Sequence, residues 1–181
     1  MTLSGAKGHS YNNPRTWLRG MILTMNFLFF RWRIPKNLPP EIQTVCDELA
    51  ALTDQESVVR RAHEILSTRF RARKYLTYPL LWKIFDRDLS RIWSRTSFLH
   101  CTHMNWLLKI VLVRSGHFVE ADVREKWTFL TVISPHQYAK VRMHDGQWIN
   151  VDVWGSTYGI PFGNYAHGFM LRYAQHDKKP Q

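Results

Sequence analysis

The sequence predicts an α+β fold, in which a helical N-terminal half packs on an antiparallel β-meander. Apolar residues recur at helical spacing before Gly116 and alternate with polar residues after it. The pair Asp145-Gly146, between two alternating segments, is typical of a hairpin turn. Helices followed by strands favour the α+β class over a parallel α/β sheet. The 181 residues, 45% hydrophobic and 14% aromatic, suit one core-forming domain with an appendage and exclude a disordered chain.

The appendage is a basic arm at residues 1–38, which we expect to be partly disordered and to contain a short apolar helix. The chain has 25 Lys and Arg against 14 Asp and Glu, a formal charge of +11, and no acidic residue precedes Glu41. Residues 20–30 are apolar but fall short of the roughly 20 residues that span a membrane. Basic residues follow them in place of a signal-peptide cleavage site. This segment is therefore either a core-packing helix or an interfacial anchor.

The main domain is predicted at residues 39–176, followed by a tail at 177–181, and it begins with two helices. Pro39 or Pro40 opens the first, which runs through Leu52. Thr53 and Glu56 have the spacing of a capping box for the second, whose apolar positions continue to Phe70. The basic run at 69–74 closes this helix, where cations meet exposed carbonyls. Residues 75–93 predict a short helix, a turn and another helix.

A third long helix is predicted from Cys101 to Ser115, and strands follow it. Gly116 is a natural C-terminal stop for this helix. From Val119 to Val123 apolar and polar residues alternate, and residues 127–133 and 147–153 are further strand segments. One face of the helix carries apolar side chains, namely Cys101, Met104, Leu108, Val111 and Leu112.

The apolar pattern also selects the register of the hairpin. A two-residue turn at Asp145-Gly146 places apolar residues of one strand opposite polar residues of the other, so we reject it. A three-residue loop, residues 144–146 with Gly146 left-handed, opposes Ala139 with Val151 and aligns the apolar residues on one face. In this register Asp152 is a diagonal neighbour of His136, within side-chain reach.

Three residues then have the chemistry of a thiol-dependent active site. Cys101 opens a helix, whose N-terminus stabilises a thiolate, and an adjacent imidazolium at His136 stabilises it further. His136 would accept and return the proton, and Asp152 would fix the orientation of the imidazole. The backbone N–H groups at the start of the helix provide donors for a developing oxyanion.

The order Cys, His, Asp resembles the transglutaminase-like superfamily, a circularly permuted relative of the papain fold. The similar segments are residues 98–116, residues 134–141, where His136 opens a strand, and residues 145–152, where Trp148 precedes Asp152 after a glycine turn. The resemblance implies Cys101 as nucleophile, His136 as general base and acid, and Asp152 as orienting carboxylate. It also implies an oxyanion donor upstream, for which Trp82 and Trp93 are candidates.

The expected function is cleavage or transfer at amide or ester bonds of a protein or peptide substrate, through a thioester and without a cofactor. Water as acceptor gives a peptidase or amidase and an amine gives a transglutaminase, and the sequence leaves both open. The alternative is a non-enzymatic module of the same fold whose basic surface binds nucleic acid or an anionic membrane. Since the half with the candidate triad, residues 96–181, has an excess of only three basic residues, nucleic acid is disfavoured. Residues 1–40 are the expected contact with a membrane or an acidic partner.

The remaining cysteine and histidine residues have simpler expected roles. Two cysteines are too few for a disulfide scaffold, so we expect reduced thiols in the cytoplasm, with Cys46 structural. His100, Cys101 and His103 are a rival cluster for zinc, with His117 and His144 as further nitrogen ligands. Residues at adjacent positions do not converge easily on one ion, so we favour no metal.

Overall fold

The computed structural model describes residues 32–130, 134–168 and 172–174. The chain divides into two units, residues 1–33 and 34–181, and the fold described here is that of the second. Most of the predicted N-terminal arm, with its apolar segment 20–30, and the tail at 177–181 lie outside the described residues. Within the described ranges, no helix has both the length and the apolar character needed to cross a membrane.

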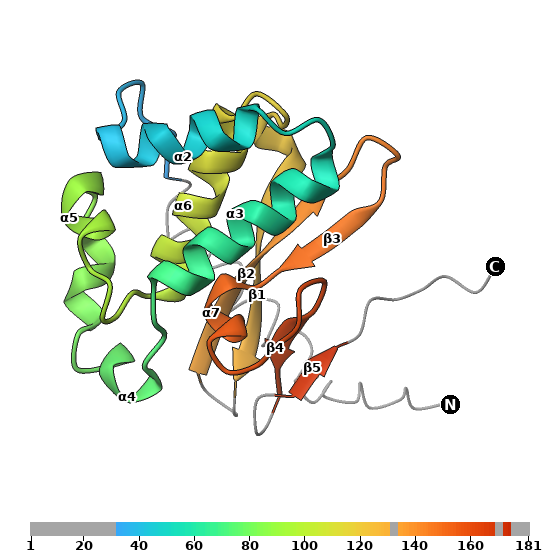
Figure 1. The fold of residues 1–181 in the computed structure, drawn as a ribbon. Coiled ribbons are helices and arrows are strands. Elements are labelled where there is room, and N and C mark those ends of the chain that lie inside the picture. The colour runs from blue at the N-terminus through green and yellow to red at the C-terminus, as the bar shows by residue number, and fades with distance from the viewer. Residues whose placement is uncertain (1–31, 131–133, 169–171, 175–181) are drawn as a thin grey trace, which may run out of the picture. The chain divides into compact units, whose positions relative to one another are not determined.

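The second unit is an α+β fold, as predicted, with most helices before the strands (Figure 1). A three-stranded antiparallel sheet has the order β1-β2-β3, and β4 and β5 form a separate antiparallel pair. The elements in chain order are α2 (Pro40–Ala50), α3 (Gln55–Arg69), α4 (Lys74–Thr77), η1 (Leu81–Phe85), α5 (Leu89–Trp93), α6 (Cys101–Arg114), η2 (Glu120–Asp122), β1 (Val123–Leu130), β2 (Ser134–Arg142), β3 (Trp148–Val151), α7 (Val153–Ser156), β4 (Tyr165–His167) and β5 (Arg172–Ala174).

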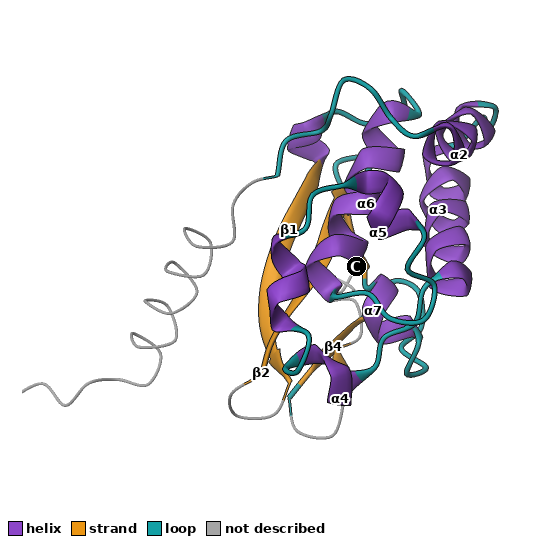
Figure 2. Ribbon diagram, turned by 90° about the vertical axis from the view of Figure 1, so that its left-hand side faces the viewer, coloured by secondary structure: helices purple, strands orange, loops and turns teal. Residues whose placement is uncertain are grey.

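Helix α6 is the centre of the unit. It packs on β2 on one side and on α2 and α3 on the other, so the helices form two layers over the sheet (Figure 2). Every residue from 102 to 112 is buried, including Lys109, whose Nζ lies 3.5 Å from Glu125 Oε1 on β1. The prediction of a single apolar face for this helix is therefore incomplete, because a helix that lies between two layers is buried on all sides.

The second helix begins one residue later than the sequence predicts. Asp54, and not Thr53, is the N-cap of α3, and its Oδ1 accepts a hydrogen bond of 2.8 Å from the Ser57 N–H. Glu56 does not complete a capping box, since its carboxylate pairs with Arg60. At the other end, Arg71 donates to the Ser67 carbonyl at 3.1 Å. This contact agrees with the interpretation of the basic run at 69–74 as a helix end.

The hairpin has the predicted register. Ala139 pairs with Val151 and Val141 with Ile149, and Gly146 has a φ of 81° in the three-residue loop. The strand before it starts later than predicted, because residues 120–122 form a 3-10 turn in which Asp122 Oδ2 accepts from the Val119 N–H at 3.1 Å. The predicted alternation before Val123 is therefore wrong.

Candidate active site

Cys101 is the first residue of α6, as predicted, and its side chain is partly exposed. The side chain of the N-cap residue, His100, accepts no hydrogen bond from the backbone N–H groups of the first turn. Uncapped N–H donors and the helix dipole at this end favour a negative charge. The local structure thus suits a thiolate at Cys101 and an oxyanion beside it.

The other cysteine is in a different environment. Cys46 lies on α2 and is 1% exposed. Burial raises the pKa of its thiol to about 11, against a smaller opposing effect of the Arg114 charge. Cys46 therefore stays protonated at neutral pH, which agrees with the structural role expected from the sequence.

His136 and Asp152 form a buried pair beyond the paired part of the hairpin. Nε2 of His136 lies 2.8 Å from Oδ2 of Asp152, and each side chain is 1% exposed. The contact that the register predicts between them is therefore present, whereas their catalytic roles stay predictions. Because Nε2 faces the carboxylate, Nδ1 is the ring nitrogen that remains for a thiol.

Cys101 is the third member of this group. Burial of the ring disfavours the imidazolium, but the charge and hydrogen bond of Asp152, with smaller effects of Cys101, outweigh it and raise the pKa of His136. Cys101 therefore lies near enough to the imidazole to favour its charged form. The structure thus brings all three predicted residues together, and the neighbours of His136 favour the charged form of its imidazole.

The carboxylate of Asp152 is held by three donors. Oδ1 accepts from the Gly155 N–H at 2.7 Å, which makes Asp152 the N-cap of α7. Oδ2 accepts from the Ala166 N–H at 2.9 Å as well as from His136. Two backbone amides therefore fix the carboxylate before it orients the imidazole.

Gly155 and Trp154 complete the packing around the His136–Asp152 pair. A Cβ atom added at Gly155 would lie 2.5 Å from Oδ2 of Asp152, so the carboxylate occupies the space of a side chain at this position. The Trp154 ring lies 4.9 Å from the His136 ring, centroid to centroid, at an angle of 47°. Sequence reasoning did not identify Gly155, Trp154 or Ala166. A glycine three residues after an N-cap aspartate was the available signal for the first.

Helix α6 and strand β2 meet at the candidate site. Asn105, one turn after Cys101, is buried and donates to Oε1 of Gln137 at 3.4 Å. Gln137 is the neighbour of His136 on β2, so this bond ties the start of the helix to the start of the strand. Residues next to the candidate triad therefore reinforce its geometry.

The histidines beside Cys101 do not form a metal site. Nε2 of His100 lies 3.2 Å from the Thr77 carbonyl oxygen, and Nε2 of His103 lies 2.9 Å from that of Asp86. Among the residues that the structure describes, no three His, Cys, Asp or Glu side chains are grouped as metal ligands. The two imidazoles instead attach the segment between residues 77 and 86 to the first turn of α6.

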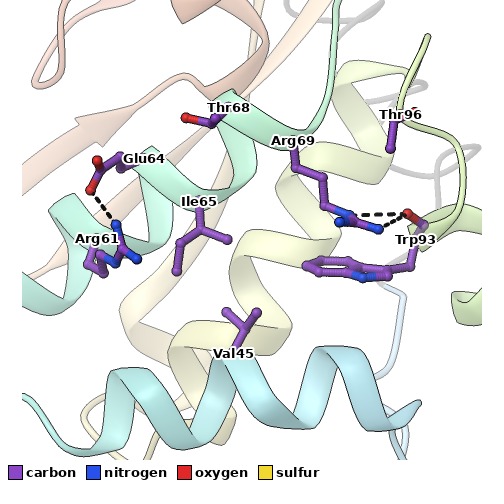
Figure 3. Close-up of a pocket in the computed structure, with 8 residues that line it drawn as sticks. All are labelled: Val45, Arg61, Glu64, Ile65, Thr68, Arg69, Trp93 and Thr96. Atoms are coloured by element: carbon purple, nitrogen blue, oxygen red, sulfur yellow. Dashed lines mark hydrogen bonds and ion pairs between the residues drawn. The ribbon is translucent and has the colours of Figure 1, made fainter.

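The two tryptophans proposed as oxyanion donors lie in other surroundings. Trp82 is 63% exposed on η1. The Arg69 guanidinium lies over the Trp93 ring, with its central carbon 4.4 Å from the ring centroid. Trp93 also lines a pocket between α2 and α3 (Figure 3). Arg69 also donates to the Trp93 carbonyl at 3.1 Å. None of the three candidate catalytic residues lines this pocket, which is a separate feature of the helical layers.

Comparisons with protein-family models, with curated proteins and with solved structures gave no match to this chain.

Proposed function

We propose that this chain is a cysteine-dependent enzyme that cleaves or transfers acyl groups at amide or ester bonds through a thioester intermediate. The observation that supports it most strongly is the buried His136–Asp152 pair, with Nε2 and Oδ2 2.8 Å apart, and with Cys101, at the start of α6, near enough to the same imidazole to affect its pKa. The order of the three residues, with Cys101 at the start of a helix, His136 on β2 and Asp152 directly after β3, also supports a relationship to the transglutaminase-like superfamily, as the resemblance in sequence suggests.

In the proposed reaction the Cys101 thiolate attacks the carbonyl carbon of the substrate, and the C=O electron pair moves to the oxygen. Backbone N–H groups at the start of α6 stabilise the oxyanion. The C=O bond then re-forms and the bond to the leaving amine or alcohol breaks, as this group takes a proton from the His136 imidazolium. The acyl group remains on Sγ as a thioester.

Neutral His136 takes a proton from water or an amine as that acceptor attacks the thioester, and Cys101 leaves as a thiolate. Asp152 keeps the imidazole oriented through both steps. Water as acceptor makes the enzyme a peptidase or amidase, and an amine makes it a transglutaminase. The substrate class that we propose is protein or peptide. A thiol nucleophile that must stay reduced fits a reducing compartment such as the cytoplasm.

An activated ester tests the thioester step directly. We expect p-nitrophenyl acetate to release nitrophenolate in a burst and to leave an acetyl group on Cys101, identified by peptide mass spectrometry. Cys101→Ala is expected to lose both signals, whereas Cys46→Ala, the matched control, retains them. His136→Ala is expected to slow acylation by about 10²-fold or more, the usual range for a positioned acid or base.

The same assay contains the outcomes that would overturn the proposal. Equal acetylation of both cysteines, or a Cys101 adduct whose rate does not change in His136→Ala, would mean that the thiol reacts without assistance. Addition of a primary amine then separates the two acceptors, since a transglutaminase transfers the acetyl group to the amine and a hydrolase releases acetate.

A further inference from the structure

Exposed apolar side chains gather in one short segment of the described residues. Among the residues that the structure describes, seven large hydrophobic side chains are exposed, and the two outside this segment are Val119 and Tyr158. The five within it are Tyr75 (67% exposed), Tyr78 (54%), Leu81 (47%), Trp82 (63%) and Phe85 (69%). Solvent-exposed aromatic clusters of this kind mark interaction sites.

The exposed side chains of this segment lie on two successive turns, α4 and η1, and on the residue that ends α4. Its turns continue from α4 into η1, since the Leu80 N–H donates to the Leu76 carbonyl at 3.1 Å and the Lys83 N–H to the Leu80 carbonyl at 3.0 Å. Tyr75 and Tyr78 are three residues apart on the first of these turns, and Trp82 and Phe85 are three residues apart on the second, so each pair lies on one side of its turn. Ile84, between them, is buried at 5% exposure. We call the exposed side, with residues 75, 78, 82 and 85, the aromatic face (its turns lie around α4 in Figure 1).

Basic residues flank the aromatic face. Residues 71–87 include one acidic side chain, Asp86, which is already paired with Arg95 and lies 3.7 Å from Arg91. The basic residues of the same range are Arg71, Arg73, Lys74, Lys83 and Arg87. The surface is therefore both aromatic and cationic.

The aromatic face is rigidly attached beside Cys101. His100 and His103, both at least 95% buried, bond to the carbonyls of Thr77 and Asp86, one on each side of the cysteine. Two backbone carbonyls of the segment are thus fixed to the first turn of α6. A preformed surface loses little conformational entropy when it binds.

We propose that the aromatic face and its flanking cations bind an anionic membrane surface. Tyrosine and tryptophan partition to the membrane–water interface, where an apolar ring and a polar edge are both accommodated. Lysine and arginine are attracted to acidic headgroups, by about fivefold in affinity for each residue near the surface. The combination matches this ligand in both chemistry and charge. Membrane binding would bring Cys101 close to substrates at the membrane, and this consequence rests on the proposed function. The membrane binding itself does not depend on the proposed function.

Vesicle co-sedimentation of the full chain tests the proposal. The wild-type chain is expected to bind vesicles of phosphatidylcholine with one third phosphatidylserine at low salt, and vesicles of phosphatidylcholine alone at least tenfold more weakly. The double variant Trp82→Ala, Phe85→Ala is expected to lower affinity for the acidic vesicles at least tenfold, and Arg73→Glu at least fivefold. The matched controls, Val119→Ala for an exposed apolar residue and Lys126→Glu for an exposed cation on β1, are expected to stay within twofold.

A second readout locates the inserted ring. Brominated lipid quenches tryptophan fluorescence at short range, and Trp82→Phe, which keeps the apolar surface, is expected to bind normally with much weaker quenching. Cys101→Ala is expected to bind like the wild type, so failure of the catalytic proposal leaves this one intact.

Three results would overturn the membrane proposal. The first is no binding to acidic vesicles at low salt, and the second is binding that the Trp82, Phe85 variant does not change. The third is binding to polyglutamate, but not to vesicles, that the same variants weaken, since this would make the aromatic face a site for an acidic protein.

Discussion

Substitution of Gly155 by alanine changes a single atom next to the proposed catalytic carboxylate. The new Cβ would lie 2.5 Å from Oδ2 and 2.7 Å from Cγ of Asp152, whereas ordinary contact begins at 3.4 Å. The carboxylate must therefore move by about 0.9 Å. It is buried and held by hydrogen bonds of 2.7, 2.8 and 2.9 Å to Gly155, His136 and Ala166, so this movement breaks at least one of them.

The steric effect of Gly155→Ala on stability is expected to be unfavourable, whereas its effect on helix propensity is favourable. Alanine in place of glycine favours a helix by up to about 1 kcal/mol. A lost hydrogen bond to a charged group costs about 1.5 to 3 kcal/mol. We therefore expect Gly155→Ala to lower the free energy of unfolding by about 2 kcal/mol when more than one bond weakens. A displacement near 1 Å at a catalytic group is also expected to slow acylation of Cys101 by about 10²-fold.

Urea unfolding and the nitrophenyl acetate assay measure the two effects on the same variant. Ser156→Ala, at the next position of α7, is the control and is expected to change each by little, because among the described residues its hydroxyl bonds only to the Val153 carbonyl. If Gly155→Ala is as stable as the wild type and acylates Cys101 at the same rate, the carboxylate is not confined as described and its positioning role is refuted.

Three further outcomes follow from the same structure. Asp152→Asn removes the charge that raises the pKa of His136, so this pKa, measured by NMR, is expected to fall; an unchanged value would argue against the pair. Burial lowers the pKa of His103 to about 4, below its ordinary value near 6.5, so the folded state favours the neutral ring. The contribution of neutral His103 to stability is expected to fall by about 3 kcal/mol as the pH decreases from about 6.5 to 4. Because burial also lowers the pKa values of His63 and His100, His103→Gln, which keeps an N–H donor for the Asp86 carbonyl, is expected to weaken the pH dependence of urea unfolding without abolishing it. Cys46, with a thiol pKa of about 11, is expected to resist alkylation at pH 7 in the native protein and to react only after unfolding.

The sequence predicted best where a pattern and a local rule agree. The hairpin register follows from the alignment of Ala139 and Val141 with their partners and from a glycine at a position of positive φ. Once this register is known, the proximity of His136 and Asp152 follows from strand geometry. The start of α6 at Cys101 similarly follows from apolar spacing and Gly116 as a stop.

Tertiary contacts explain what the sequence did not predict. Thr53 and Asp54 are both good N-caps, and only the bond from Ser57 distinguishes them. Burial of α6 on all sides depends on α2 and α3, more than 30 residues earlier in the chain. The Ala166 donor comes from β4, across a loop with no periodic pattern. The hairpin alone therefore predicts the pair, but not the amides that hold it.

Alkylation of the native chain by iodoacetamide across pH tests the central claim, that Cys101 and His136 form a reactive pair oriented by Asp152. If His136 assists Cys101, labelling is expected to be selective for Cys101 and to remain fast near pH 6, where an ordinary thiol, which ionises near pH ~8.5, is almost fully protonated. The account also predicts that His136→Ala shifts this labelling to alkaline pH. Equal labelling of Cys101 and Cys46, with the pH profile of a free thiol, would contradict it.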